Sequence, residues 1–94
     1  MSREEEVLSM ILNACKAYNA TRVILFGSRA KGTHRERSDF DIAVSGVNDM
    51  NRFRDEIDEL PTLYTIDVLN LDTCKNQLLL EDIESYGREI YKAV

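Results

Sequence analysis

No other part of the sequence limits the fold as strictly as residues 39–44 (DFDIAV). The even-numbered positions of this segment carry large apolar side chains: Phe40, Ile42 and Val44. Because successive side chains of a β-strand point to opposite faces of a sheet, this alternation predicts a strand with one apolar and one polar face. If helices bury the apolar face, Asp39 and Asp41 must lie together on the opposite face.

The remaining elements follow from the spacing of apolar residues and from turn signals. Spacings of three and four predict helices over residues 3–18, from Asn48 or Asp49 to Pro61, and from Asp72 or Thr73 to Gly87. Short β-branched or alternating runs predict further strands over residues 21–26, 63–69 and 89–92. This order of helices and strands predicts an α+β fold, and the length of 94 residues predicts a single domain over residues 1–94.

Charge and composition argue against several classes of protein. Twelve basic and 17 acidic residues give a net charge of −5, which argues against a surface that binds a polynucleotide directly. No apolar run approaches the roughly 20 residues of a membrane span, and the first residues (MSREEEV) are acidic, so we expect a cytoplasmic protein. Cys15 and Cys74 lack the paired spacing of a zinc site, and His34 is the only histidine. Any metal should therefore be bound by oxygen atoms.

Three aspartates form a candidate metal site. Asp39 and Asp41 on one strand would lie about 7 Å apart at Cα. Their oxygen atoms could converge on two divalent ions about 3.5 to 4 Å apart, the arrangement of two-metal phosphoryl chemistry. Asp67 lies in the predicted strand 63–69, on the face opposite Ile66 and Val68, and is the candidate third ligand. The alternative for Asp67 is a solvent-exposed residue near the end of a strand.

A glycine–serine turn at residues 27–32 (GSRAKG) provides a candidate phosphate site. Gly27 directly follows a predicted strand and lets the backbone approach a ligand, and Ser28 offers a hydroxyl and an N–H group. Four of the 12 basic residues lie between positions 29 and 37: Arg29, Lys31, Arg35 and Arg37. Some of these cations would meet a polyphosphate, and others would be solvated loop residues.

The joint pattern is specific, although each part alone is weak. It consists of GSRAKG at 27–32, SDFD at 38–41 and IDVLN at 66–70, followed by the closing segment ESYGREIY. This pattern resembles the nucleotidyltransferase superfamily that includes DNA polymerase beta, and most closely its small MNT-domain members. Lys31 stands where many relatives carry arginine. The resemblance covers nearly the whole chain and implies the nucleotidyltransferase fold, a small mixed sheet of about four strands with helices packed on one face.

The resemblance also implies the chemistry of the site. Ser28 and the Gly27 backbone would hold the β- and γ-phosphates of ATP, with Lys31 and Arg29 as cationic contacts. Asp39 and Asp41 would bind two Mg²⁺ ions, and Asp67 would bind the catalytic one. An acceptor hydroxyl would attack the α-phosphorus in line and pyrophosphate would leave. Asp67 is the candidate group that receives the acceptor's proton.

The small MNT proteins further resemble the antitoxins of HEPN/MNT toxin–antitoxin pairs. This implies transfer of AMP to a tyrosine of a HEPN-domain toxin, with ATP and that toxin as partners in a homo- or hetero-oligomer. The first alternative is a non-catalytic, nucleotide-binding antitoxin that acts by complex formation alone. The second is a small-molecule nucleotidyltransferase of the aminoglycoside type.

Overall fold

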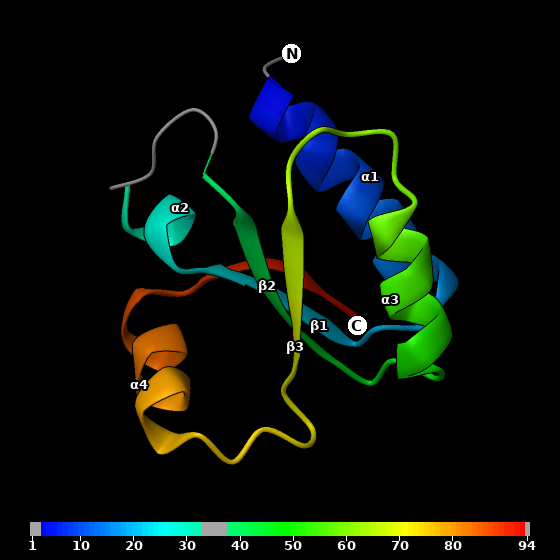
Figure 1. Ribbon diagram of the computed structural model, residues 1–94. Helices are drawn as coiled ribbons and strands as arrows, with labels where there is room; N and C mark the ends of the chain where they lie inside the picture. Colours follow the sequence, from blue (N-terminus) through cyan, green and yellow to red (C-terminus); the bar gives the residue numbers. More distant parts are fainter. Residues whose placement is uncertain (1–2, 33–37, 94) are drawn as a thin grey trace.

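The computed structural model describes residues 3–32 and 38–93 (Figure 1). Within these ranges the elements follow in the order α1 (Arg3–Ala17), β1 (Arg22–Phe26), α2 (Ser28–Lys31), β2 (Phe40–Ser45), α3 (Met50–Asp58), β3 (Ile66–Asn70), α4 (Gln77–Tyr86) and β4 (Arg88–Lys92). The predicted α+β order is confirmed, and the short helix α2 occupies the glycine–serine turn.

The strands form one mixed four-stranded sheet in the order β3-β2-β1-β4. β1 is antiparallel to both β2 and β4, whereas β2 and β3 are parallel and connected through α3. The predicted small mixed sheet is therefore confirmed. The parallel pair sets Phe40 opposite Ile66 and Asp41 opposite Asp67.

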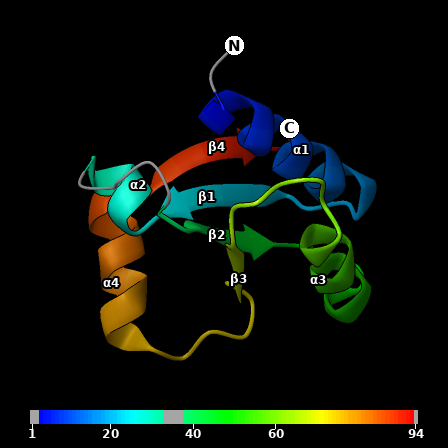
Figure 2. The same cartoon turned by 45° about the horizontal axis from the view of Figure 1, so that its top comes forward.

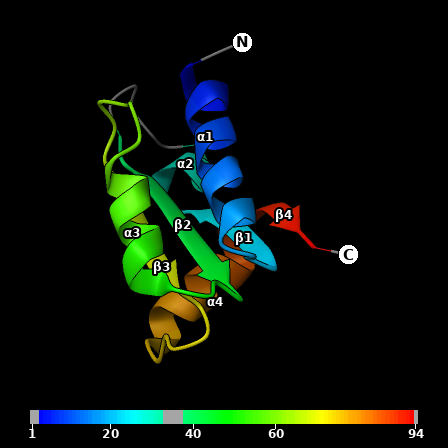
Figure 3. The same ribbon diagram turned by 90° about the vertical axis from the view of Figure 1, so that its right-hand side faces the viewer.

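One face of the sheet is covered by α1 and α3, which lie side by side (Figure 3). The even-numbered residues of β2 are fully buried there, as their alternation predicts. They belong to a core that includes Val7, Ile11 and Cys15 from α1, Val23 and Leu25 from β1, and Phe53 and Ile57 from α3. Burying these side chains supplies the main hydrophobic stabilisation of the domain.

The opposite face is only partly covered. α4 packs against it through Ile83, in a small second cluster with Ile24, Phe26 and Ala43. Figure 2 shows α4 beside α2 at one end of the sheet. The odd-numbered residues of β2, Asp41 among them, belong to this second face.

The starts of α4 and β3 differ most from the prediction. α4 begins at Gln77, and its N-cap is Asn76 in place of the predicted Asp72 or Thr73. The Asn76 side chain accepts a hydrogen bond of 3.1 Å from the Leu79 N–H. Residues 63–65 precede β3, which begins only at Ile66. The predicted Asp49 cap of α3 and the end of α4 at Gly87 are confirmed.

Asp72 bonds to the end of β2 instead of capping a helix. Its carboxylate accepts hydrogen bonds from Ser45 Oγ at 2.6 Å and from the Gly46 N–H at 2.9 Å. These bonds hold the pKa of Asp72 below its ordinary value of 3.8. The β3–α4 connection is thereby fastened to the loop that follows β2.

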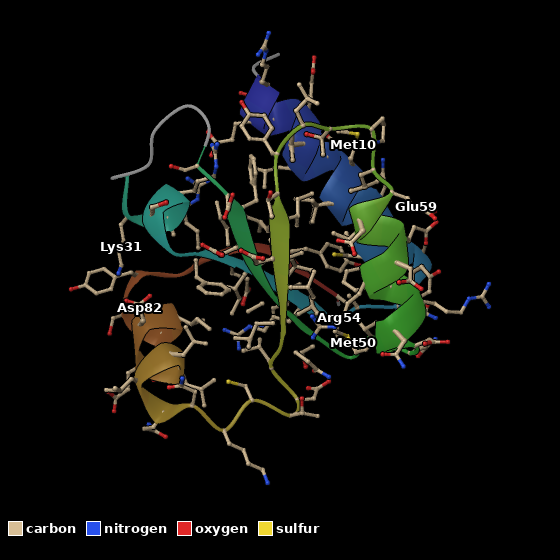
Figure 4. The ribbon with its side chains drawn as sticks, in the orientation of Figure 1. Met10, Lys31, Met50, Arg54, Glu59 and Asp82 are labelled. Carbon is tan, nitrogen blue, oxygen red and sulfur yellow. The ribbon has the colours of Figure 1, made fainter. Side chains whose placement is uncertain are left out.

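The free edge of β3 is contacted by α3. The Thr65 carbonyl accepts a hydrogen bond from the Phe40 N–H of β2. Successive carbonyls of a strand point to opposite sides, so the Val68 carbonyl, three residues later, points away from β2. Arg54 of α3 donates to this Val68 carbonyl at 2.8 Å (Figure 4). The outer edge of the strand that carries Asp67 is thus partly occupied by a side chain of the same chain.

Both cysteines are free, and Cys15 is buried. Burial raises the pKa of the Cys15 thiol to about 12, so it remains protonated at neutral pH. Among the helices of residues 3–32 and 38–93, none is long and apolar enough to cross a membrane.

Candidate functional site

Strand pairing brings two of the predicted acids together. Asp41 of β2 and Asp67 of β3 are direct partners in the parallel ladder, and both lie on the partly open face of the sheet. The pKa of Asp41 is raised to about 6, first by partial burial, then by the charge of Asp67 and a hydrogen bond with it, and finally by the charge of Asp39. Asp41 is therefore the centre of an acidic cluster in which like charges repel one another.

Asp39 stands at the edge of this cluster. It is exposed and precedes the first residue of β2, and it acts on Asp41 through its charge. Among residues 3–32 and 38–93, no three or more His, Cys, Asp or Glu side chains are already arranged around one metal position. The pair that the described structure brings into contact is thus Asp41 and Asp67, and the exposed Asp39 lies close enough to act on Asp41 through its charge.

The donor set fits a hard divalent cation. All three candidate ligands are carboxylates, the oxygen donors that Mg²⁺ and Ca²⁺ prefer. Asp41 is half-buried and faces the negative charges of Asp67 and Asp39, and a cation between them would relieve this repulsion. The arrangement can therefore hold a metal ion and bring a bound anion to it.

The glycine–serine turn lies directly against the carboxylates. Phe26, the last residue of β1, pairs with Asp41, so the chain leaves β1 beside this acid. Gly27 has φ 73° and ψ −154°, a conformation that is essentially restricted to glycine. A Cβ atom at position 27 would collide with Asp41 Oδ2. Only a glycine lets the backbone pass this close to the acidic cluster.

Ser28 begins α2 immediately after this turn and is half-buried. The backbone N–H groups at the start of a helix favour anions, although α2 has only four residues. Gly27 therefore lies between two groups of the candidate site. The Asp41 carboxylate packs against its Cα, and Ser28 is the next residue in the chain. A metal-bound polyphosphate would have acids on one side and the serine turn on the other.

Lys31, the last residue of α2, is held by α4. Its Nζ lies 2.8 Å from Asp82 Oδ1 and 5.0 Å from the centre of the Tyr86 ring. Figure 4 shows Lys31 and Asp82 facing each other between the two helices. A role of Lys31 in binding phosphate requires its side chain to leave Asp82. The sequence gives no sign of this partner, because Asp82 belongs to a helix that the turn meets only in the folded chain.

Arg29 is buried on the side of the sheet that Phe40 occupies, and its predicted contact with a phosphate stays a prediction. The residue is 5% exposed, and its guanidinium lies 3.9 Å from the centre of the Phe40 ring. Phe40 points to the face covered by α1 and α3, whereas Asp41 points to the opposite face. The described contacts of the guanidinium therefore include Phe40 and Ser38, and none of them is with the pair Asp41 and Asp67. The predicted basic residues Arg35 and Arg37, and the single histidine His34, lie outside the described residues.

The chain is similar to known proteins in family and in fold. A family model described as "Polymerase beta, Nucleotidyltransferase" matches residues 9–93. A chain of a crystal structure of a toxin–antitoxin with AMP-PNP is 20% identical, with a TM-score of 0.66 over 90% of this chain and 73% of that chain.

Two mutants of the MntA-HpeT toxin–antitoxin are also similar to the chain. One, with two Asp-to-Glu substitutions, is 18% identical, with a TM-score of 0.65 over 90% of this chain and 73% of that one. Another is 18% identical, with a TM-score of 0.60 over 99% of this chain and 75% of that one. At these identities the likeness concerns the fold. The comparison with curated proteins found no match.

Proposed function

Because this chain belongs to the polymerase beta nucleotidyltransferase family, we propose that it transfers AMP from ATP to a hydroxyl acceptor. One observation carries the proposal. The Gly27 backbone lies against the carboxylate of Asp41 where Asp41 pairs with Asp67, so a phosphate turn and two candidate metal ligands share one site. Transfer of a nucleotidyl group requires this combination of anion binding and metal binding.

In this proposal each part of the chain has a separate task. Asp39, Asp41 and Asp67 would hold two Mg²⁺ ions, which would supply positive charge at the α-phosphate and lower the pKa of the acceptor hydroxyl. Ser28 and the Gly27 backbone bind the terminal phosphates, and Lys31 exchanges its contact with Asp82 for the leaving group.

The bond changes then balance. The acceptor oxygen forms a bond to the α-phosphorus, and the bond from that phosphorus to pyrophosphate breaks. Asp67 receives the proton that the acceptor hydroxyl loses. Its place on an edge strand, on the partly open face, supports this role because an acceptor can approach from that side.

We further propose that the acceptor is a tyrosine of a HEPN-domain toxin and that the chain acts as its antitoxin. The support is the resemblance of GSRAKG and SDFD to MNT domains, together with the fold shared with toxin–antitoxin structures, one of which contains AMP-PNP. The net charge of −5 also suits a basic ribonuclease as partner.

The test is incubation of the chain with Mg²⁺, ATP labelled at its α-phosphorus, and a HEPN-domain protein. We expect label on a tyrosine of the HEPN protein. Asp39→Ala and Asp41→Ala should abolish labelling while the circular dichroism spectrum stays that of the wild type. Asp58→Ala, at an exposed position of α3, is the matched control and should label normally.

Other outcomes would decide against the proposal. A tight complex without label would show that the chain neutralises its partner by binding alone, as a nucleotide-binding antitoxin. Label on an aminoglycoside and never on protein would identify a small-molecule nucleotidyltransferase. Normal labelling by the Asp39→Ala, Asp41→Ala double variant would exclude these carboxylates as the catalytic centre.

A further inference from the structure

Arg29 is the one buried charged side chain among the residues that the structure describes. Removing a guanidinium from water is unfavourable unless hydrogen bonds and charges compensate it. A chain of this size retains such a group only where its contacts offset the loss of hydration. The contacts of Arg29 therefore indicate what it does.

These contacts converge on the segment that contains Asp39. Arg29 Nε and Nη2 donate to the Ser38 carbonyl at 3.1 and 2.9 Å. The guanidinium also lies 3.9 Å from the centre of the Phe40 ring. Arg29 thus holds the residue before Asp39 by two hydrogen bonds and the residue after it by a cation–π contact.

Two further contacts fix the guanidinium itself. Its Nη1 lies 3.7 Å from Glu4 Oε1 at the start of α1, and its carbon lies 5.1 Å from the centre of the Tyr64 ring. Tyr64 also packs edge-on against Phe40, at 5.3 Å between ring centres. The guanidinium is therefore enclosed by elements from three distant parts of the sequence.

We propose that Arg29 is a positioning residue that fixes Asp39 relative to the glycine–serine turn. Arg29 directly follows Ser28, so a single side chain connects the glycine–serine turn to the segment that contains Asp39. Asp39 precedes the first residue of β2, and within residues 3–32 and 38–93 the strand pairing begins only at Phe40. This inference rests on the proposed function, in which Asp39 is a metal ligand.

Lysine cannot replace arginine in this arrangement. A planar guanidinium donates through two nitrogens to one acceptor while its face stacks on an aromatic ring, whereas an ammonium group offers one point of charge. Arg29→Lys keeps the charge beside Glu4 but loses the paired donation to Ser38. It therefore separates positioning from charge and is milder than truncation to alanine.

The experiment compares the whole chain with two variants, Arg29→Lys and Arg22→Lys. Arg22 is the matched control, because it is an exposed arginine in an ion pair with Glu89, away from the acids. Binding of Mn²⁺ alone is measured by electron paramagnetic resonance. We expect Arg29→Lys to weaken Mn²⁺ binding about tenfold, the effect typical of losing a group that orients a metal ligand. Arg22→Lys should bind as the wild type does.

A second measurement needs no metal. Heteronuclear NOE values of the metal-free protein report the mobility of the backbone at residues 38–40. We expect Arg29→Lys to lower these values while those of α3 stay unchanged, a pattern that a general loss of stability would not give. Thermal unfolding of each variant shows that it remains folded at the temperature of measurement.

The two measurements separate the inference from the proposed function. If Arg29→Lys keeps residues 38–40 as rigid as in the wild type, Arg29 does not position Asp39 and the inference is wrong. If it loosens this segment but even the wild type binds no Mn²⁺, Arg29 positions Asp39 and the metal site of the proposed function fails. If it loosens the segment without weakening Mn²⁺ binding, metal binding does not depend on the position that Arg29 gives Asp39, and the inference that Arg29 positions a metal ligand is overturned.

Discussion

Replacing Asp41 by asparagine should make the metal-free protein more stable at neutral pH. The side chain keeps its shape, so it still fits against Gly27 and can donate a hydrogen bond to Asp67. The pKa of Asp41 is about 6 in the folded protein against an ordinary value of 3.8. Because the folded state binds the proton more tightly than the unfolded chain, wild-type stability falls as the pH rises from about 4 through about 6.

The magnitude follows from this shift. About two pKa units at about 1.4 kcal/mol each give an upper limit of about 3 kcal/mol. Asp41 is partly exposed, so screening by solvent reduces the effect to about 1–2 kcal/mol. For a domain of this size, that corresponds to a rise of roughly 5–10 °C in Tm.

The assay is urea unfolding of the wild type and Asp41→Asn in EDTA, at about pH 4.5 and about pH 7.5. We expect a gain at the higher pH that largely disappears at the lower pH, where the wild-type carboxyl is protonated. Asp58→Asn is the control for removal of an acidic charge from an exposed surface. The reasoning is refuted if Asp41→Asn gains nothing at neutral pH, or if it gains the same amount at both pH values.

Three other substitutions test separate features. Gly27→Ala should lower stability by about 2–3 kcal/mol, because position 27 has a backbone conformation restricted to glycine and a Cβ collides with Asp41. The control is Gly32→Ala, also at positive φ but in open space, which should lower stability by only about 1 kcal/mol. Equal losses of the two variants in thermal melts would contradict the collision. Phe53→Ala should lower the free energy of unfolding by about 3–5 kcal/mol, since Phe53 is fully buried between α3 and the sheet, and a loss below about 1 kcal/mol in urea would show that this core is not packed as described. Asp72→Asn should destabilise the protein at neutral pH and lose this effect as the pH falls below about 4. The reason is that the hydrogen bonds from Ser45 and Gly46, which lower the pKa of Asp72, stabilise its ionised form. A pH-independent difference in Tm would argue against these charged bonds.

Alternation along the strands predicted the central part of the site. A period of two in β2 and β3 places Asp41 and Asp67 on the face away from the main core, and the structure confirms that these two acids meet. The direct pairing of Asp41 with Asp67 depends on the register between β2 and β3. That register is set by the length and path of the connection through α3. Periodicity within one strand carries no such information.

Tertiary contacts explain what the sequence could not show. Asp72, Thr73 and Asn76 are all acceptable helix caps before the same apolar run. The distant bonds from Ser45 and Gly46 to Asp72 leave Asn76 as the cap. Likewise, a cluster of basic residues in the sequence does not reveal that Arg29 turns inward to Ser38 while Lys31 turns to α4.

The contact between Arg54 and the Val68 carbonyl limits how a second protein can attach to the sheet. An outer strand such as β3 otherwise offers unpaired backbone groups onto which another chain can add a strand, and this is a common route to aggregation. With the Val68 carbonyl already bonded, an incoming strand would have to displace a side chain of α3 first. A second chain that approaches the sheet from this side therefore meets the Arg54 side chain before it can pair with the β3 backbone at Val68.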